Sequence, residues 1–161
     1  HKHSLEKAFN GARKFAEKPT GWIAFIGSFG CGKTHLASAI ANFRFDLGFS
    51  PLFIVVPDLL DHLRATFNPK SIIRYDKLFE GVKKSELLIL DDLGTQSATP
   101  WAREKLYQLF NYRYQAKLPT VITSVDYMID IDPRIRSRMM DTRLCTNFAI
   151  TAPLYTKKKN R

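Results

Sequence analysis

Eight consecutive residues carry the strongest chemical signal in the chain. Residues 27–34 read Gly-Ser-Phe-Gly-Cys-Gly-Lys-Thr, which fits the pattern G-x-x-x-x-G-K-[ST] of a phosphate-binding loop. Glycine lets the backbone curl closely around an anion, because a side chain at the same position would collide with it. The N–H groups of such a loop and the positive end of the following helix attract phosphate oxygens. The segment therefore predicts a nucleotide-binding site.

The residues of this loop have distinct expected roles. Lys33 would place a positive charge at the β- and γ-phosphates, and the hydroxyl of Thr34 would bind Mg²⁺. A glycine-rich turn that ends in Lys-Thr by coincidence is the alternative, and the strand and helix expected on either side argue against it. The residues expected to contact ATP or ADP are Gly27, Ser28, Phe29, Gly30, Cys31, Gly32, Lys33, Thr34 and His35.

A pair of acids follows a second apolar segment. Residues 87–92 read Leu-Leu-Ile-Leu-Asp-Asp, as in a buried strand that ends in two carboxylates. The carboxyl ends of parallel strands open onto the ligand crevice of such a sheet. Asp91 would then bind Mg²⁺ directly or through water, and Asp92 would orient and polarise the attacking water. The two acids could instead cap a turn with Gly94, but the phosphate-binding loop upstream favours the catalytic interpretation.

Hydroxyl groups and arginines provide the remaining candidates. The apolar segment 119–124 ends in Thr123 and Ser124, which could hydrogen-bond to the γ-phosphate or to the attacking water. Two hydroxyls that merely satisfy the end of a strand are an equally good interpretation. Residues 134–138 place three arginines on one short helix, and one of them could reach the γ-phosphate of a neighbouring subunit.

A parallel sheet is needed to bring these groups together. Apolar runs predict strands at 22–26, 52–56, 87–92, 119–124 and 144–150, and the run at 52–56 reads as buried on both faces. Apolar residues at helical spacing predict helices between them, with Asp58, Thr99 and Asp132 as expected N-caps and Gly48 as a C-cap. The order α-β-α-β-α-α-β-α-β-α-β predicts an α/β fold with five parallel strands. We expect a helix and linker over 1–20, the core over 21–153 and a basic tail over 154–161.

Composition restricts the partners and the compartment. The chain has 161 residues with 25 Lys and Arg against 15 Asp and Glu, a net charge of +10. This excess predicts a nucleic-acid partner, although solubility or neutralisation of bound nucleotide would also explain it. No apolar run approaches the ~18–20 residues of a membrane span. Cys31 and Cys145 have no metal-site spacing and indicate a reducing cytoplasm. The first candidates for nucleic-acid contact are Lys70, Arg74, Lys77, Lys83 and Lys84, with the basic tail as an addition.

At these motifs the sequence resembles the AAA+ ATPases of the bacterial helicase-loader group, which are the DnaC/DnaI-type loaders and the related IstB transposition helpers. The resemblance rests on residues 27–34 as Walker A, 87–94 as Walker B, 119–124 as the sensor-1 strand and Arg136-Ser137-Arg138. It implies the sheet order 5-1-4-3-2 and ATP bound with Mg²⁺ between subunits of a ring or spiral. It also implies that Arg138 is the arginine finger and that single-stranded DNA binds on the inner surface. Loaders dock the replicative helicase through a separate N-terminal domain, which we expect this chain to lack.

Two departures from the family pattern bear on activity. Val125 stands where the sensor-1 strand usually ends in Asn, so Thr123 or Ser124 would have to substitute for it. We also expect the chain to lack the helical lid. The sequence therefore predicts the Mg²⁺-dependent ATPase core of a helicase loader acting in DNA replication. The alternatives are an IstB-like transposition helper, a small-molecule P-loop kinase and a nucleotide-sensing DNA-binding module that does not hydrolyse ATP.

Overall fold

The computed structural model describes residues 1–66, 70, 74–94, 99–125 and 131–153. Five parallel strands form one sheet in the order β2-β3-β4-β1-β5, which is the order implied by the family resemblance. The alternation of helices and strands along the chain is also as the sequence predicts. The strands are β1 (Trp22–Ile26), β2 (Leu52–Val55), β3 (Leu88–Leu93), β4 (Thr120–Ser124) and β5 (Cys145–Ala149).

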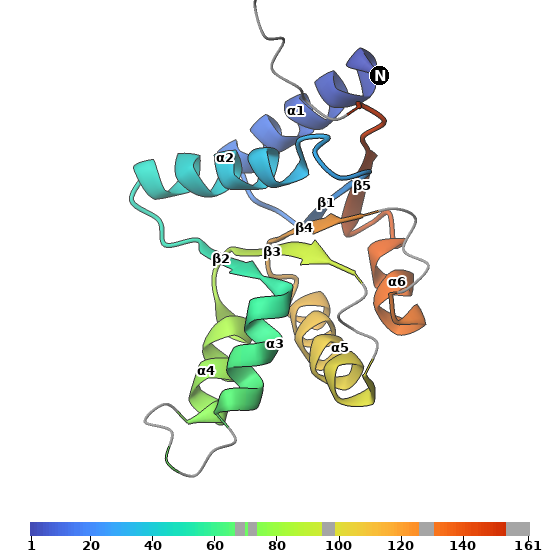
Figure 1. Cartoon of the computed structure of the whole chain (residues 1–161). Helices are drawn as coiled ribbons and strands as arrows, with labels where there is room; N and C mark the ends of the chain where they lie inside the picture. Colours follow the sequence, from blue (N-terminus) through green and yellow to red (C-terminus); the bar gives the residue numbers. More distant parts are fainter. Residues whose placement is uncertain (67–69, 71–73, 95–98, 126–130, 154–161) are drawn as a thin grey trace, which may run out of the picture.

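Helices cover both faces of the sheet (Figure 1). On one face lie α1 (Lys2–Glu17) and α2 (Lys33–Asp46). The other face carries α3 (Val56–Ala65), α4 (Tyr75–Lys84), α5 (Pro100–Gln115) and α6 (Pro133–Met139). Each face has its own apolar core, because alternate side chains of the strands point to opposite sides of the sheet. None of the described helices is long and apolar enough to cross a membrane.

Local signals account for the N-termini of α5 and α6 and for the chain reversal after α2. The hydroxyl of Thr99 accepts a hydrogen bond from the N–H of Ala102 at 3.2 Å, and the carboxylate of Asp132 accepts one from the N–H of Arg134 at 2.9 Å. Two of the three predicted N-caps, Thr99 and Asp132, are therefore confirmed. The C-cap of α2 is Leu47, one residue before the predicted Gly48, and Gly48 follows it with a φ of +87°, in the left-handed region that favours glycine.

Two expectations for the second strand and its helix are wrong. The strand β2 lies at the edge of the sheet and is only partly buried, with Phe53 36% exposed, so its apolar run does not mark a strand covered on both faces. The helix α3 begins at Val56, immediately after β2, and Pro57 lies in its first turn. Proline is tolerated in a first turn, because the N–H groups there have no partner within the helix. Asp58 therefore lies inside the helix and is not its N-cap.

The first helix is part of the packed structure. Its apolar side buries Ala8, Ala12, Phe15 and Ala16 against α2 and β5. Gly11 faces the ring of Phe148, and a Cβ at this position would collide with that ring. The close approach brings the N-terminal turn of α1 beside the phosphate-binding loop, since Leu5 reaches within 3.8 Å of the position that a Cβ of Gly32 would occupy.

A buried arginine fixes the beginning of β4. Arg113 of α5 is fully buried and donates through Nε to the hydroxyl of Thr120 at 2.9 Å. Its other nitrogens donate to the carbonyl oxygens of Lys83, Ser85 and Pro119 at 2.9, 2.8 and 2.6 Å. Burial lowers the pKa of the Arg113 guanidinium to about 10, so the group stays protonated at neutral pH. This side chain thus ties together α5, the end of α4 and the start of β4.

We predict that Arg113→Met lowers the free energy of unfolding by about 3 kcal/mol or more, because buried carbonyl oxygens lose their donors. Urea denaturation of the two proteins measures the difference. Arg143→Met is the matched control, since the Arg143 side chain is 86% exposed and should cause a much smaller loss. Equal losses for the two variants would contradict the structural role of Arg113.

Candidate functional site

The loop at residues 27–34 joins β1 to the N-terminus of α2. Gly30 and Gly32 have φ values of +72° and +104°, in the left-handed region that favours glycine. Gly27 lies against the chain that follows β5, and a Cβ there would collide with the carbonyl oxygen of Ile150. The loop therefore curls tightly in front of the first turn of α2, whose N–H groups have no partners within the helix. This arrangement can bind the phosphates of a nucleotide.

The side chain of Lys33 folds back over this loop. Its ammonium group donates to the carbonyl oxygens of Gly27 at 2.7 Å and Ser28 at 2.8 Å, and Lys33 is only 8% exposed. Cys31 is buried next to it, with Sγ 3.9 Å from the lysine Nζ. Because both carbonyl acceptors are neutral, the anionic oxygens of a bound phosphate would compete effectively for the ammonium group.

The carboxylate of Asp91 lies at the centre of the site. The hydroxyl of Thr34 donates to its two oxygens at 3.0 and 3.1 Å, and the hydroxyl of Thr123 donates to Oδ1 at 2.6 Å. Asp91 is 7% exposed, so these two donors compensate a largely buried charge. A carboxylate beside a hydroxyl is a set of oxygen ligands that suits Mg²⁺, together with phosphate oxygens and water. Thr34 and Asp91 therefore fit the metal-binding role predicted for them.

Asp92 adopts an unusual backbone conformation next to Asp91. Its φ is +62°, and the pairing between β3 and β4 shifts register between Leu90 and Leu93. The N–H of Asp92 donates to the hydroxyl of Thr123 at 2.9 Å, which holds the bulge in place. Left-handed backbone at a residue other than glycine costs free energy and persists only where the surroundings enforce it. The bulge lets two successive carboxylates reach the site.

Thr123 and Ser124 have different positions in the structure. Thr123 contributes to the lining of the site cavity and contacts both acids of β3. The hydroxyl of Ser124 is buried and donates to the carbonyl oxygen of Leu93 at 2.6 Å. Val125 brings an apolar side chain to the cavity where a polar one is usual in the family. Of the two hydroxyls predicted as candidates, only that of Thr123 is therefore joined to the acids.

A cavity of about 1360 Å³ lies in front of these groups. It is lined by loop residues 29–35, including His35, and by Asp91, Asp92 and Thr123. Gly27 and Ser28 instead contribute the carbonyl oxygens that bind Lys33.

The first helix lines the same cavity with apolar side chains, a feature that the sequence did not indicate. Leu5 and Phe9 of α1 line the cavity together with Phe29 of the loop, and the three residues are 38%, 55% and 75% exposed. The cavity thus combines polar groups that suit phosphates with apolar side chains that suit a planar base. The helical pattern of α1 predicts which residues share a side, but it cannot say which neighbour that side will meet.

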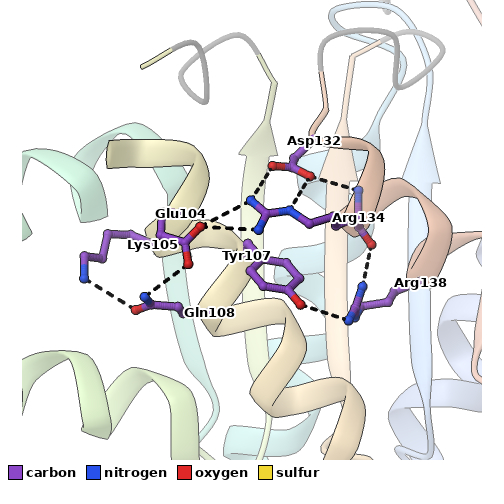
Figure 2. A network of polar contacts seen from close by, with 7 residues as sticks. All are labelled: Glu104, Lys105, Tyr107, Gln108, Asp132, Arg134 and Arg138. Atoms are coloured by element: carbon purple, nitrogen blue, oxygen red, sulfur yellow. Dashed lines mark hydrogen bonds and ion pairs between the residues drawn. The ribbon is translucent and has the colours of Figure 1, made fainter. Parts of the chain in front are cut away.

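Two arginines of α6, Arg134 and Arg138, form a separate cluster against α5. Arg134 binds the carboxylates of Asp132 at 2.9 Å and Glu104 at 3.3 Å, and Arg138 reaches the Tyr107 hydroxyl at 3.4 Å (Figure 2). The pKa of Asp132 is lowered, mainly by its hydrogen bond with Arg134. Arg138 is not one of the described residues that line the cavity, so it does not reach the site of its own subunit.

The strand order, the loop and the paired acids together define a P-loop NTPase of the AAA+ class. A sequence model of the family described as "IstB-like ATP binding protein" matches residues 13–144. The chain belongs to this family of ATP-binding proteins.

Known proteins similar to this chain act in bacterial replication. The replicative helicase loader DnaC of Escherichia coli (strain K12) is 31% identical over 137 residues, which are 83% of this chain and 56% of DnaC. The chain spans about half the length of the curated relatives it matches, with 52% for DnaC of Buchnera aphidicola subsp. Baizongia pistaciae.

Solved structures of replication proteins share the fold. The DnaC helicase loader superposes with a TM-score of 0.80 at 24% identity, covering 92% of this chain and 90% of that one. DnaI gives 0.71 at 28% identity, with 92% and 82% covered. The replication initiator DnaA bound to AMPPCP and single-stranded DNA gives 0.75 at 20% identity, with 88% and 45% covered. The AAA+ fold predicted from the sequence is confirmed.

We predict that Thr123→Val lowers the free energy of unfolding by about 2 kcal/mol, because the carboxylate of Asp91 loses a donor and the N–H of Asp92 loses its acceptor. Thr123→Ser keeps the hydroxyl and should retain most of this stability. Chemical denaturation of the three proteins measures both differences. If the valine variant kept full stability and the serine variant lost it, the methyl group and not the hydroxyl would be the stabilising part of Thr123.

Proposed function

We propose that this chain is the Mg²⁺-dependent ATPase core of a bacterial replicative helicase loader. The observation that carries the proposal is the carboxylate of Asp91, held between the hydroxyls of Thr34 and Thr123 beside a phosphate-binding loop. The similarity to helicase loaders supports the choice of pathway. Such a role would place the chain in the bacterial cytoplasm, where the thiols of Cys31 and Cys145, both free in the structure, stay reduced.

Positioning and electrostatics would supply the catalysis. The loop N–H groups and Lys33 would bind the phosphates, and Thr34 and Asp91 would hold Mg²⁺, which neutralises developing negative charge when bound. Asp92 would accept a hydrogen bond from the attacking water and orient it towards the γ-phosphate. Thr123 would fix both acids, since its hydroxyl contacts the side chain of Asp91 and the backbone of Asp92. Ser124 would contribute only indirectly, because its hydroxyl binds the carbonyl oxygen of Leu93 and so stabilises the ends of β3 and β4.

A second subunit would complete the site. Arg138 lies away from the cavity of its own subunit, so we assign it to the γ-phosphate of a neighbour in a ring or spiral of identical chains. An arginine that reaches the phosphate from another subunit stabilises the transition-state charge and contributes about 10³–10⁵ in rate. The family resemblance at Arg138 supports this assignment.

Single-stranded DNA would be the polyanionic partner. The net charge of +10 and the similarity to a DnaA that binds single-stranded DNA support this part of the proposal. Among the candidate contacts, Lys83 and Lys84 both pair with the carboxylate of Glu80. Arg74 and Lys77 are exposed at the start of α4 and are better placed to meet phosphates. The replicative helicase would bind through a part of the protein outside this chain, and the basic tail lies outside the described residues.

Two observations favour other functions. The matching family is named for IstB, which supports a transposition helper, and binding to a transposase and not to a helicase would identify it. Val125 lines the cavity where a polar sensor is usual, which supports a module that binds ATP without hydrolysing it. Measurable ATP binding without turnover at any protein concentration would identify the second alternative.

The proposed function predicts that ATP turnover per subunit rises with protein concentration, because each site needs a neighbour, and rises again with single-stranded DNA. Steady-state phosphate release over a wide concentration range measures both effects. Lys33→Ala is the control and should abolish turnover, because it removes the positive charge at the phosphates. A flat rate at the background level despite ATP binding would overturn the ATPase assignment.

We predict that Arg138→Ala leaves ATP binding unchanged and lowers concentration-dependent turnover by about 10³-fold or more. Titration with a fluorescent ATP analogue and phosphate release measure the two quantities. Arg136→Ala is the matched comparison, because Arg136 lies on the same short helix and is exposed. Loss of turnover only in the Arg136 variant would transfer the role of the finger to that residue.

A further inference from the structure

The three arginines of α6 have different surroundings. Arg134 is bound by two carboxylates, and its guanidinium carbon lies 3.8 Å from the centre of the Tyr107 ring. Arg136 is exposed and makes no side-chain hydrogen bond or ion pair within the described ranges. Arg138 is half-buried and lies along α5. These differences separate a structural arginine, a free one and one that is held.

Three neutral oxygen atoms hold Arg138. One terminal nitrogen donates to the side-chain oxygen of Asn111 at 2.6 Å and to the Tyr107 hydroxyl at 3.4 Å. The other donates to the carbonyl oxygen of Arg134 at 2.8 Å. The guanidinium also lies 5.1 and 5.3 Å from the ring centres of Tyr107 and Tyr114. Figure 2 shows the contacts with Tyr107 and Arg134, and Asn111 lies one helical turn further along α5.

The position of Arg138 is held but not fully satisfied. Its Nε is buried and has no hydrogen-bond acceptor, and a buried donor without a partner is destabilising. None of its acceptors carries a negative charge, in contrast to those of Arg134. Hydrogen bonds between a guanidinium and a phosphate are stronger than those to neutral oxygens. A phosphate within reach would therefore displace Asn111 and Tyr107.

We propose that Asn111 is a positioning residue that keeps Arg138 retracted on α5 in a lone subunit, and that the triphosphate bound by a neighbouring subunit draws it out. The second part of this inference, in which Arg138 acts on the neighbouring subunit, rests on the proposed function. The retracted state rests on the contacts of the single subunit alone. Assembly would then have to overcome the hydrogen bonds of Asn111 before turnover begins.

Two substitutions at Asn111 should act in opposite directions. Asn111→Ala removes the acceptor, so the protein concentration at half-maximal ATP turnover should fall by roughly threefold. Asn111→Asp gives Arg138 a charged partner, so that concentration should rise by roughly tenfold. Gln115→Ala is the matched control, since Gln115 is an exposed amide on the last turn of α5 and should change neither value. A purely structural role of Asn111 would shift both variants in the same direction, and that result would overturn the proposal.

A second measurement separates failure of this inference from failure of the proposed function. In the chain labelled with ¹⁵N-arginine, the Nε–H of Arg138 should exchange slowly with water at low protein concentration without nucleotide. It should exchange fast in Asn111→Ala and remain slow in Gln115→Ala, and Arg138→Lys assigns the signal. Slow exchange in a protein without turnover would support the retracted state and reject the ATPase. Exchange at Arg138 as fast as at Arg136 in the unaltered chain would reject the retracted state.

Discussion

The buried carboxylate of Asp91 is the constraint on which the site depends. An ionised group that is 7% exposed needs hydrogen-bond donors, and it finds them in Thr34 and Thr123. The first donor comes from the N-terminus of α2 and the second from the end of β4. The loop, β3 and β4 must therefore meet at one point to within hydrogen-bonding distance. The bulge in β3 and the left-handed backbone of Asp92 are the local adjustments that make this possible.

The strand β4 is fixed by polar groups at both ends. Arg113 binds Thr120 where the strand begins, and Thr123 binds Asp91 where it ends. Between these points Val121 and Ile122 point into the two apolar cores on opposite faces of the sheet. Buried polar networks are stabilising only when their members are satisfied, and they then favour one arrangement over others. The register of β4 against β3 thus places the polar groups of the site as well as the core.

Sequence patterns predicted the parts of this structure that depend on local chemistry. A few neighbouring residues are enough to recognise the glycines at 30 and 32, the cap at Thr99 and the paired acids. The position of a strand at the edge of the sheet cannot be predicted in this way. The apolar run of β2 resembles that of a central strand, although β2 pairs with a single neighbouring strand, β3. The hydrogen bonds of Thr123 with Asp91 and Asp92 are not predictable either, because they depend on the bulge in β3. The helical pattern of α5 does not predict the role of Arg113, because its hydrogen-bond acceptors lie at the end of α4 and before β4.

The charges around the cavity give a reason for a site shared between subunits. The described lining residues contain the lysines Lys2 and Lys33 and the acids Glu6, Asp91 and Asp92, so these side chains provide no excess positive charge for a triphosphate. Under the proposed function, a further cation to stabilise the transition state, beside Lys33 and Mg²⁺, has to come from elsewhere. Arg138 suits that role because its acceptors are neutral. An arginine bound like Arg134 would have to break an ion pair before it could serve a neighbour. Under the proposed function, the contrast between these two side chains on one short helix would link the packing of α6 to the timing of turnover.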